Sequence, residues 1–245
     1  MRTIRALSEL KESIIHWKQN AVSIGFVPTM GALHVGHFAL IDKSEKENDI
    51  TIVSIFVNPL QFNNPTDLEH YPRVVSEDLE LLSKKSVDAV FIPDEHEFYP
   101  TKPLVSIDFG SLSERLEGEH RPGHFEGVGV VVSKLLNLIQ PTRAYFGLKD
   151  LQQFLLIRQM STDLNFPSEI IGVETVREPS GLALSSRNRR LSDKGKETAT
   201  IIHKGLDLIA SGVQSHEPIQ DLLTNCRNLY ENEPDFELEF LEAVD

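Results

Sequence analysis

The stretch Phe26-Val-Pro-Thr-Met-Gly-Ala-Leu-His-Val-Gly-His37 is the most informative part of the chain. Apolar residues lead into a Pro-Thr turn, two histidines follow, and a helical pattern then continues to Glu47. This order predicts a strand, a tight loop and the N-terminus of a helix. Free backbone N–H groups at a helix start attract phosphate, and glycines allow a close approach to the backbone. The stretch therefore predicts a nucleotide or other anion near His34 and His37; zinc is the alternative, although no further ligands stand nearby at a suitable spacing.

Apolar, β-rich runs alternate with helical patterns on both sides of this stretch. Strands are predicted over 22–27, 50–57, 89–92, 143–146 and 170–176, with helices over 37–47, 76–85, 125–139 and 150–165 and an amphipathic N-terminal helix through Trp17. Continuous Val/Ile/Phe runs are typical of parallel strands covered on both faces. We therefore expect an α/β fold with a doubly wound parallel sheet, which binds ligands beyond the carboxyl ends of its strands.

The pattern changes near residue 178. Residues 177–181 form a turn cluster, 192–213 and 219–230 have amphipathic helical patterns, and 236–244 alternates like a strand. We predict a first domain over 1–177 and a smaller C-terminal α+β lid domain over 178–245. Its one predicted strand has no following partner, so two interpretations stay open: a naturally short domain or an incomplete one.

Composition limits the class of protein. The net charge of −13 over 245 residues argues against a protein that binds nucleic acid through a basic face. Cys226 is the single cysteine, which excludes an intrachain disulfide and favours a reducing compartment. No apolar run approaches the ~20 residues that span a bilayer, and no signal peptide is evident. These features predict a cytoplasmic protein with no membrane partner.

Two further loops follow predicted strands and are expected to meet the histidine loop at one mouth. Asn58 and Gln61 carry uncharged amides that could bind a hydroxyl or carboxylate, although this segment taken alone favours a simple polar turn. Lys149 and Asp150 begin a helix, with Gln153 on the same side. Lys149 suits phosphate and Asp150 a hydroxyl; the alternative is an exposed Lys beside an Asp that favours the helix dipole.

Two loops beyond these strand ends are also candidates. Leu184-Ser-Ser-Arg187 offers two hydroxyls and a guanidinium to triphosphate oxygens, although a capped loop would have the same residues. Glu119-His-Arg-Pro-Gly-His-Phe125 could form a positively charged flap around Arg121. The P-loop pattern and the Gly-rich dinucleotide fingerprint are both absent, which argues against a P-loop kinase and a dinucleotide oxidoreductase.

Taken in order, six motifs closely resemble those of the pantoate–β-alanine ligase family, within the HIGH-type nucleotidyltransferases. The matching stretches are Val27-Pro-Thr-Met-Gly-Ala-Leu-His-Val-Gly-His37, Ser54-Ile-Phe-Val-Asn-Pro-Leu-Gln-Phe62, Tyr71-Pro-Arg73, Arg121-Pro-Gly-His-Phe125, Phe146-Gly-Leu-Lys-Asp-Leu-Gln-Gln153 and Gly181-Leu-Ala-Leu-Ser-Ser-Arg-Asn188. The resemblance covers essentially the whole chain and implies a Rossmann-like fold. It also implies ATP-dependent condensation of (R)-pantoate with β-alanine to pantothenate through pantoyl adenylate, with release of AMP and pyrophosphate.

The resemblance implies roles for individual residues as well. His34, His37 and Lys149 would be catalytic, Gln61 and Gln153 would bind pantoate, and Gln61 would also lie near β-alanine. The ATP site would consist of Met30, Gly31, Ala32, Leu33, His34, Val35, Gly36, His37, Gly147, Leu148, Lys149, Asp150, Val176, Leu184, Ser185, Ser186 and Arg187. Mg²⁺ would neutralise the departing pyrophosphate, with Asp78 as a candidate ligand, and the protein would be a homodimer.

One departure and two alternatives accompany this resemblance. Leu148 stands where the family usually has Glu, and we expect little loss because the backbone there can still serve a nucleotide. The nearest alternative activity is an adenylyltransferase that stops after transferring AMP. A nucleotide-binding module without catalysis is a second alternative, disfavoured by the presence of His34, His37 and Lys149.

Overall fold

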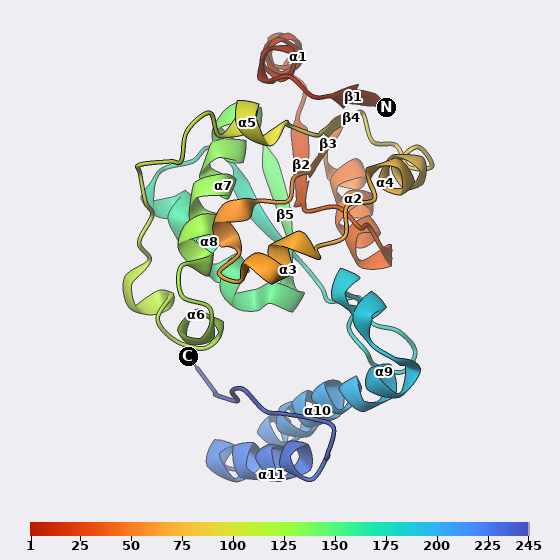
Figure 1. The fold of residues 1–245 in the computed structure, drawn as a ribbon, viewed down its shortest axis with the longest axis vertical. Helices are drawn as coiled ribbons and strands as arrows, with labels where there is room; N and C mark the ends of the chain where they lie inside the picture. Colours follow the sequence, from red (N-terminus) through yellow and green to blue (C-terminus); the bar gives the residue numbers. More distant parts are fainter. Residues whose placement is uncertain (245) are drawn as a thin grey trace. The chain divides into compact units, whose positions relative to one another are not determined.

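The computed structural model describes residues 1–244 and has a six-stranded, all-parallel sheet in its N-terminal part (Figure 1). The strands are β1 (Arg2–Ile4), β2 (Ile24–Thr29), β3 (Ile50–Ile55), β4 (Ala89–Phe91), β5 (Arg143–Gly147) and β6 (Glu169–Val173). Their spatial order is β1-β4-β3-β2-β5-β6. The expected α/β fold with a doubly wound parallel sheet is confirmed.

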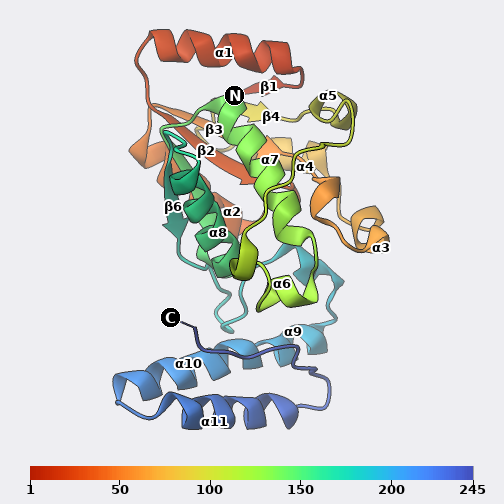
Figure 2. The ribbon, with the colours of Figure 1, turned by 90° about the vertical axis from the view of Figure 1, so that its left-hand side faces the viewer.

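Helices cover both faces of the sheet because the strands are apolar on both. In β4, Ala89 and Phe91 pack into one buried cluster, while Val90 between them packs into the other. The first cluster includes residues of α1 (Leu7–Gln19), α7 (His124–Ile139) and α8 (Leu151–Asp163), and Figure 2 shows α7 beside α8. The second includes residues of α2 (Val35–Glu47) and α4 (Val75–Leu82). The continuous apolar runs in the sequence thus reflect burial on two faces.

The N-terminus differs from the prediction of a helix alone. Residues Arg2–Ile4 form the edge strand β1, which pairs with β4, and the helix α1 follows it. Ile4 is fully buried in the sheet, which explains why so short a segment is held there. Short helices that the sequence did not predict are α3 (Pro65–Glu69), α5 (Glu95–Phe98) and α6 (Glu117–His120).

The order in which the chain adds strands to the sheet reverses between the neighbouring strands β2 and β5. From β2 it continues through β3 to β4 on one side, and it then crosses over to β5 and β6 on the other side. Ligands of open α/β sheets bind at such a switch point, outside the carboxyl ends of the strands. The loops after β2 and β5 carry His34 and Lys149, which places both residues at this point.

A second compact unit begins at Thr175, whereas the sequence predicts the boundary after residue 177. It contains the helices α9 (Asp193–Ala199), α10 (Ile201–Gln214) and α11 (Ile219–Glu231). Gly205 lets α10 and α11 pack closely, because a Cβ added there would lie only 2.2 Å from the Tyr230 hydroxyl. That hydroxyl donates to the Ile202 carbonyl at 3.0 Å, which ties the two helices together.

The predicted strand over 236–244 is wrong. These residues form no strand in the described part of the chain, since no other strand between 175 and 244 offers backbone groups for pairing. Phe236, Leu238 and Leu241 instead pack against the cluster of Ile201, Cys226 and Tyr230, so the apolar spacing reflects contact with helices. Cys226 is buried there as a small apolar residue. Among residues 1–244, no helix combines the length and apolar character needed to cross a bilayer.

Candidate active site

The loop after β2 is held in an uncommon backbone conformation by Thr29. Its hydroxyl donates to the Ser54 carbonyl at 2.7 Å and accepts from the Gly31 N–H at 3.1 Å. Gly31 and Ala32 have φ values of +83° and +50°. Left-handed conformations cost little for glycine and more for alanine, so the surrounding contacts must fix the turn.

Asp78, at the start of α4, supplies those contacts. Its Oδ2 accepts from the Ala32 N–H at 2.9 Å and its Oδ1 from the Leu33 N–H at 2.7 Å. The side chain is buried, and hydrogen bonds to an ionised carboxylate are among the stronger ones in proteins. The predicted Mg²⁺ ligand therefore uses both carboxylate oxygens to shape the histidine loop.

The two histidines cap the N-terminus of α2 reciprocally. His34 Nδ1 accepts from the Gly36 N–H at 3.1 Å, and His37 Nδ1 accepts from the His34 N–H at 3.2 Å. The ring centroids are 4.1 Å apart. Because Nδ1 is an acceptor in both rings, each neutral imidazole carries its proton on Nε2 and can donate from there.

Protonation of His37 is strongly disfavoured. Desolvation by the surrounding protein, with smaller contributions from His34 and Lys149, lowers its pKa from 6.5 to about 3. His37 is therefore a neutral hydrogen-bond donor at physiological pH. The parallel pairing of β2 with β5 brings the loops that follow these strands near each other.

The turn after β3 holds Gln61 beside the histidine loop. Gln61 is buried, its Oε1 accepts from Asn58 Nδ2 at 3.1 Å, and its Nε2 lies 3.2 Å from the Met30 sulfur. The ring of His124 contacts the Gln61 carbonyl at 2.8 Å. The structure thus brings together the predicted pantoate residue Gln61 and the predicted ATP residue Met30.

Gly127 allows this turn to approach α7. A Cβ added at Gly127 would lie 2.2 Å from the Leu60 carbonyl oxygen, so any side chain there would displace the turn. The turn itself is a short 3₁₀ helix, Pro59–Gln61, whose N-cap Asn58 accepts from the Leu60 N–H at 3.4 Å. Close packing on α7 therefore fixes the backbone from which Gln61 projects.

The loop after β5 carries Lys149. Its ammonium lies 3.2 Å from Asp150, and the two side chains are 37% and 51% exposed, which makes this a weak surface pair. Leu148 packs on the sheet, where a Cβ added at Gly172 would lie 2.7 Å from its Cδ2. The Leu148 side chain is thus partly buried against the sheet. Gln153 is half-buried one turn into α8.

Gln152, which the sequence did not single out, holds the segment that precedes the predicted flap. Its Nε2 donates to the carbonyls of Leu112 and Arg115, both at 2.9 Å, and its Oε1 accepts from the Glu117 N–H at 3.1 Å. Glu117 in turn pairs with Arg121. The signal for this role was weak, because two adjacent glutamines on a helix do not indicate which of them bonds the protein.

The predicted ATP residues Val176, Leu184, Ser185, Ser186 and Arg187 lie in the second unit. The Leu184 N–H donates to the Val176 carbonyl at 3.0 Å, across a turn that contains Gly181 with φ +91°. Ser185 caps the 3₁₀ helix Ser186–Arg190 by accepting from the Arg187 N–H at 3.3 Å. The loop therefore gathers Val176, Leu184 and the serine–arginine run.

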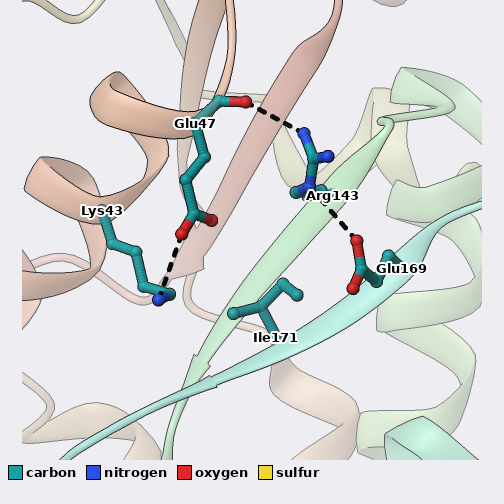
Figure 3. Close-up of a pocket in the computed structure, with 5 residues that line it drawn as sticks. All are labelled: Lys43, Glu47, Arg143, Glu169 and Ile171. Atoms are coloured by element: carbon teal, nitrogen blue, oxygen red, sulfur yellow. Dashed lines mark hydrogen bonds and ion pairs between the residues drawn. The ribbon is translucent and has the colours of Figure 1, made fainter.

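A hollow of about 410 Å³ lies at the opposite, amino edge of the sheet (Figure 3). Its walls are Lys43, Glu47, Arg143, Glu169 and Ile171. Lys43 pairs with Glu47 at 3.1 Å and Arg143 with Glu169 at 3.2 Å, so its charges bond one another. Ligands of this fold class bind at the carboxyl edge, and we take that edge, with its histidine loop, as the site.

The fold and the histidine loop thus define a doubly wound α/β protein with a histidine-capped helix start at its switch point. The pantoate–beta-alanine ligase family model matches residues 2–245, and the chain belongs to this family. Its members form pantothenate from pantoate and β-alanine with ATP.

Individual relatives agree with this membership. The pantothenate synthetase of Cytophaga hutchinsonii is 48% identical over all of this chain and 87% of its own length, and that of Clostridium botulinum is 43% identical over all of this chain and 88% of its own. The crystal structure of pantothenate synthetase from Thermus thermophilus matches with a TM-score of 0.94 at 40% identity, covering 100% of this chain and 87% of that one. A Francisella tularensis pantoate–beta-alanine ligase, complexed with beta-gamma ATP and beta-alanine, matches with a TM-score of 0.83 at 40% identity over 94% and 86%.

Proposed function

We propose that this site condenses (R)-pantoate with β-alanine in two steps. In the first, a pantoate carboxylate oxygen attacks the α-phosphorus of ATP, forming pantoyl adenylate and releasing pyrophosphate. In the second, the β-alanine amine attacks the acyl carbon, forming the amide of pantothenate and releasing AMP. Family membership and the shape of the histidine loop support this scheme.

The first step brings two anions together, so positioning and charge stabilisation should dominate catalysis. His34 and His37 donate from Nε2 to α-phosphate oxygens, and His37 does so as a neutral imidazole. Lys149 exchanges its weak contact with Asp150 for phosphate. Ser185, Ser186 and Arg187 of the C-terminal unit bind phosphate oxygens.

Gln61 and Gln153 are proposed to bind pantoate. Gln61 Nε2 faces a thioether sulfur, which is a weak acceptor, so a substrate oxygen is a better partner for the same N–H group. β-Alanine then enters near Gln61 for the second step. We assign the lid role to the C-terminal domain beyond residue 177 and to the Arg121 flap, which would shield the adenylate from water.

Magnesium is proposed to enter bound to ATP. Mg²⁺ often binds to one or two carboxylates plus substrate phosphates. Residues 1–244 contain no cluster of three or more His, Cys, Asp or Glu side chains fit to hold a metal, and Asp78 already bonds two backbone N–H groups. The described side chains therefore form no preassembled site for the ion. We also propose that the protein is a cytoplasmic homodimer.

The observation that carries this function is the pair of imidazoles that cap the N-terminus of α2 at the switch point of the sheet. The test is an assay of AMP release with ATP, pantoate and β-alanine, each omitted in turn. We expect AMP only with all three, and pyrophosphate already without β-alanine. Pyrophosphate release with a stable adenylylated product that no amine consumes would favour the adenylyltransferase instead.

A further inference from the structure

A tyrosine from a distant segment contacts the substrate-binding turn. The Tyr99 hydroxyl donates to Asn58 Oδ1 at 3.1 Å, although the two residues are 41 positions apart. Tyr99 lies at the C-terminal end of α5, after β4, whereas Asn58 follows β3. The hydrogen bond therefore joins the loops of two neighbouring strands at the carboxyl edge.

Backbone groups determine which way the Asn58 amide faces. The Leu60 N–H donates to Asn58 Oδ1 at 3.4 Å, and Asn58 Nδ2 donates to the Gly127 carbonyl at 3.1 Å. A reversed amide would place two donors together at Leu60 and two acceptors together at Gly127. Tyr99 strengthens the observed orientation by adding a second donor to Oδ1.

The orientation of Asn58 passes to Gln61. Since Asn58 Nδ2 is a donor, the group of Gln61 that faces it must be the carbonyl, Oε1. The Gln61 amide nitrogen is thereby turned toward Met30 and presents N–H groups. A ligand atom that binds there must be an acceptor, as the oxygens of a hydroxy acid are.

We propose that Tyr99 is a positioning residue that reinforces the donor face of Gln61, through Asn58, for an acceptor oxygen of pantoate. The inference rests on the proposed function for the identity of the ligand. The direction of the hydrogen bonds is independent of the proposed function, because the contacts of Asn58 define it.

The surroundings of Tyr99 keep its hydroxyl in place as a donor. The ring packs against Phe98 and Phe56, at centroid distances of 4.9 and 5.9 Å, and the Lys134 ammonium lies 5.0 Å from the ring centroid. Burial, followed by the negative charge of Glu95, raises the phenol pKa. Tyr99 therefore stays protonated over the range in which the enzyme would be assayed.

The test is Tyr99→Phe, which keeps the ring and removes only the hydroxyl. We expect KM for pantoate to rise roughly tenfold, since loss of a hydrogen bond of this kind weakens binding by about tenfold. KM for ATP should change less than twofold. Tyr145→Phe is the matched control. It also removes a tyrosine hydroxyl that bonds an asparagine, but this asparagine, Asn48, is the C-cap of α2 at the amino edge of the sheet. Both KM values should therefore stay unchanged.

Two readouts separate positioning from a general structural effect. In a Gln61→Ala background, Tyr99→Phe should change KM for pantoate by less than twofold, because the residue through which it acts is gone. In protein labelled with ¹⁵N-glutamine, Tyr99→Phe should shift the side-chain amide signal of Gln61, and Tyr145→Phe should not.

Several results would overturn the inference. They are an unchanged pantoate KM, equal rises of both KM values, additive effects in the double variant, or an unmoved Gln61 signal. A parent protein that does not consume pantoate would refute the proposed function instead. In that case the Gln61 signal would still test whether Tyr99 orients this amide.

Discussion

The two edges of the sheet are both rich in polar side chains, but they use them differently. At the amino edge, Lys43, Glu47, Arg143 and Glu169 form ion pairs with one another, and Arg143 also donates to the Glu47 carbonyl at 2.9 Å. At the carboxyl edge, the Gln61 amide faces the Met30 sulfur, and Lys149 pairs with the exposed side chain of Asp150. A hollow lined by charges is thus a poor indicator of a ligand site when those charges already have partners. The better indicator is a polar group that the fold holds rigidly against a replaceable partner.

The difference between the edges is tested most severely by removing a side chain from the carboxyl edge. His34→Ala or Lys149→Ala should lower the rate of pyrophosphate release in the first step by roughly 100-fold or more, the scale for loss of a preorganised donor. Lys43→Ala, a charge removal at the amino edge, is the control and should leave the rate within about twofold of the parent. Near-normal rates in either carboxyl-edge variant would refute its assigned role.

A smaller effect is expected where the fold supports the carboxyl edge. Asp78→Asn places an amide N–H against a backbone N–H, and it should reduce the free energy of unfolding by about 1–3 kcal/mol. ATP binding should weaken as the histidine loop loosens, while the Mg²⁺ dependence at saturating ATP stays the same. Urea denaturation and Mg²⁺ titration check both points, with Asp42→Asn as an exposed carboxylate control. A changed Mg²⁺ requirement with unchanged stability would make Asp78 an ion ligand.

The neutral state of His37 predicts a pH effect on stability. Its folded pKa of about 3 lies below the ordinary 6.5, so between these values the unfolded chain binds a proton that the folded protein does not. Stability is therefore lost as the pH falls below about 6.5. Compared with His37→Gln, the parent should lose stability faster between pH 6.5 and 4, and the difference between them should be constant above pH 7. Parallel curves across the whole range would show that His37 titrates normally.

The smallest effect should come from the amino edge itself. Arg143 and Glu169 are 33% and 62% exposed, so their ion pair should contribute less than about 1 kcal/mol. Glu169→Gln should leave turnover unchanged and lower the melting temperature by a few degrees at most, which calorimetry and the AMP assay measure. A large loss of turnover would mean that the two edges are coupled.

Predictions from the sequence were most accurate where burial repeats regularly. The five inner and C-terminal strands were predicted because each is apolar on both faces, whereas β1 was missed because three residues are too few to show a period. The strand predicted over 236–244 was wrong because alternating apolar residues pack equally well on a helix pair. The single helix predicted over 192–213 is divided at Thr200, which ends α9 and precedes α10.

The α/β class, the loops at the carboxyl edge and the family all follow from the sequence alone, because they depend on residue types at fixed local spacings. How the site residues are held emerges only in the folded protein. The bonds between Asp78 and the loop of Ala32 and Leu33, between Tyr99 and Asn58, and between Gln152 and residues 112–117 join residues 35 to 46 positions apart. Nothing in the local sequence specifies such pairs, since they form only when packing of the sheet and helices brings distant loops together.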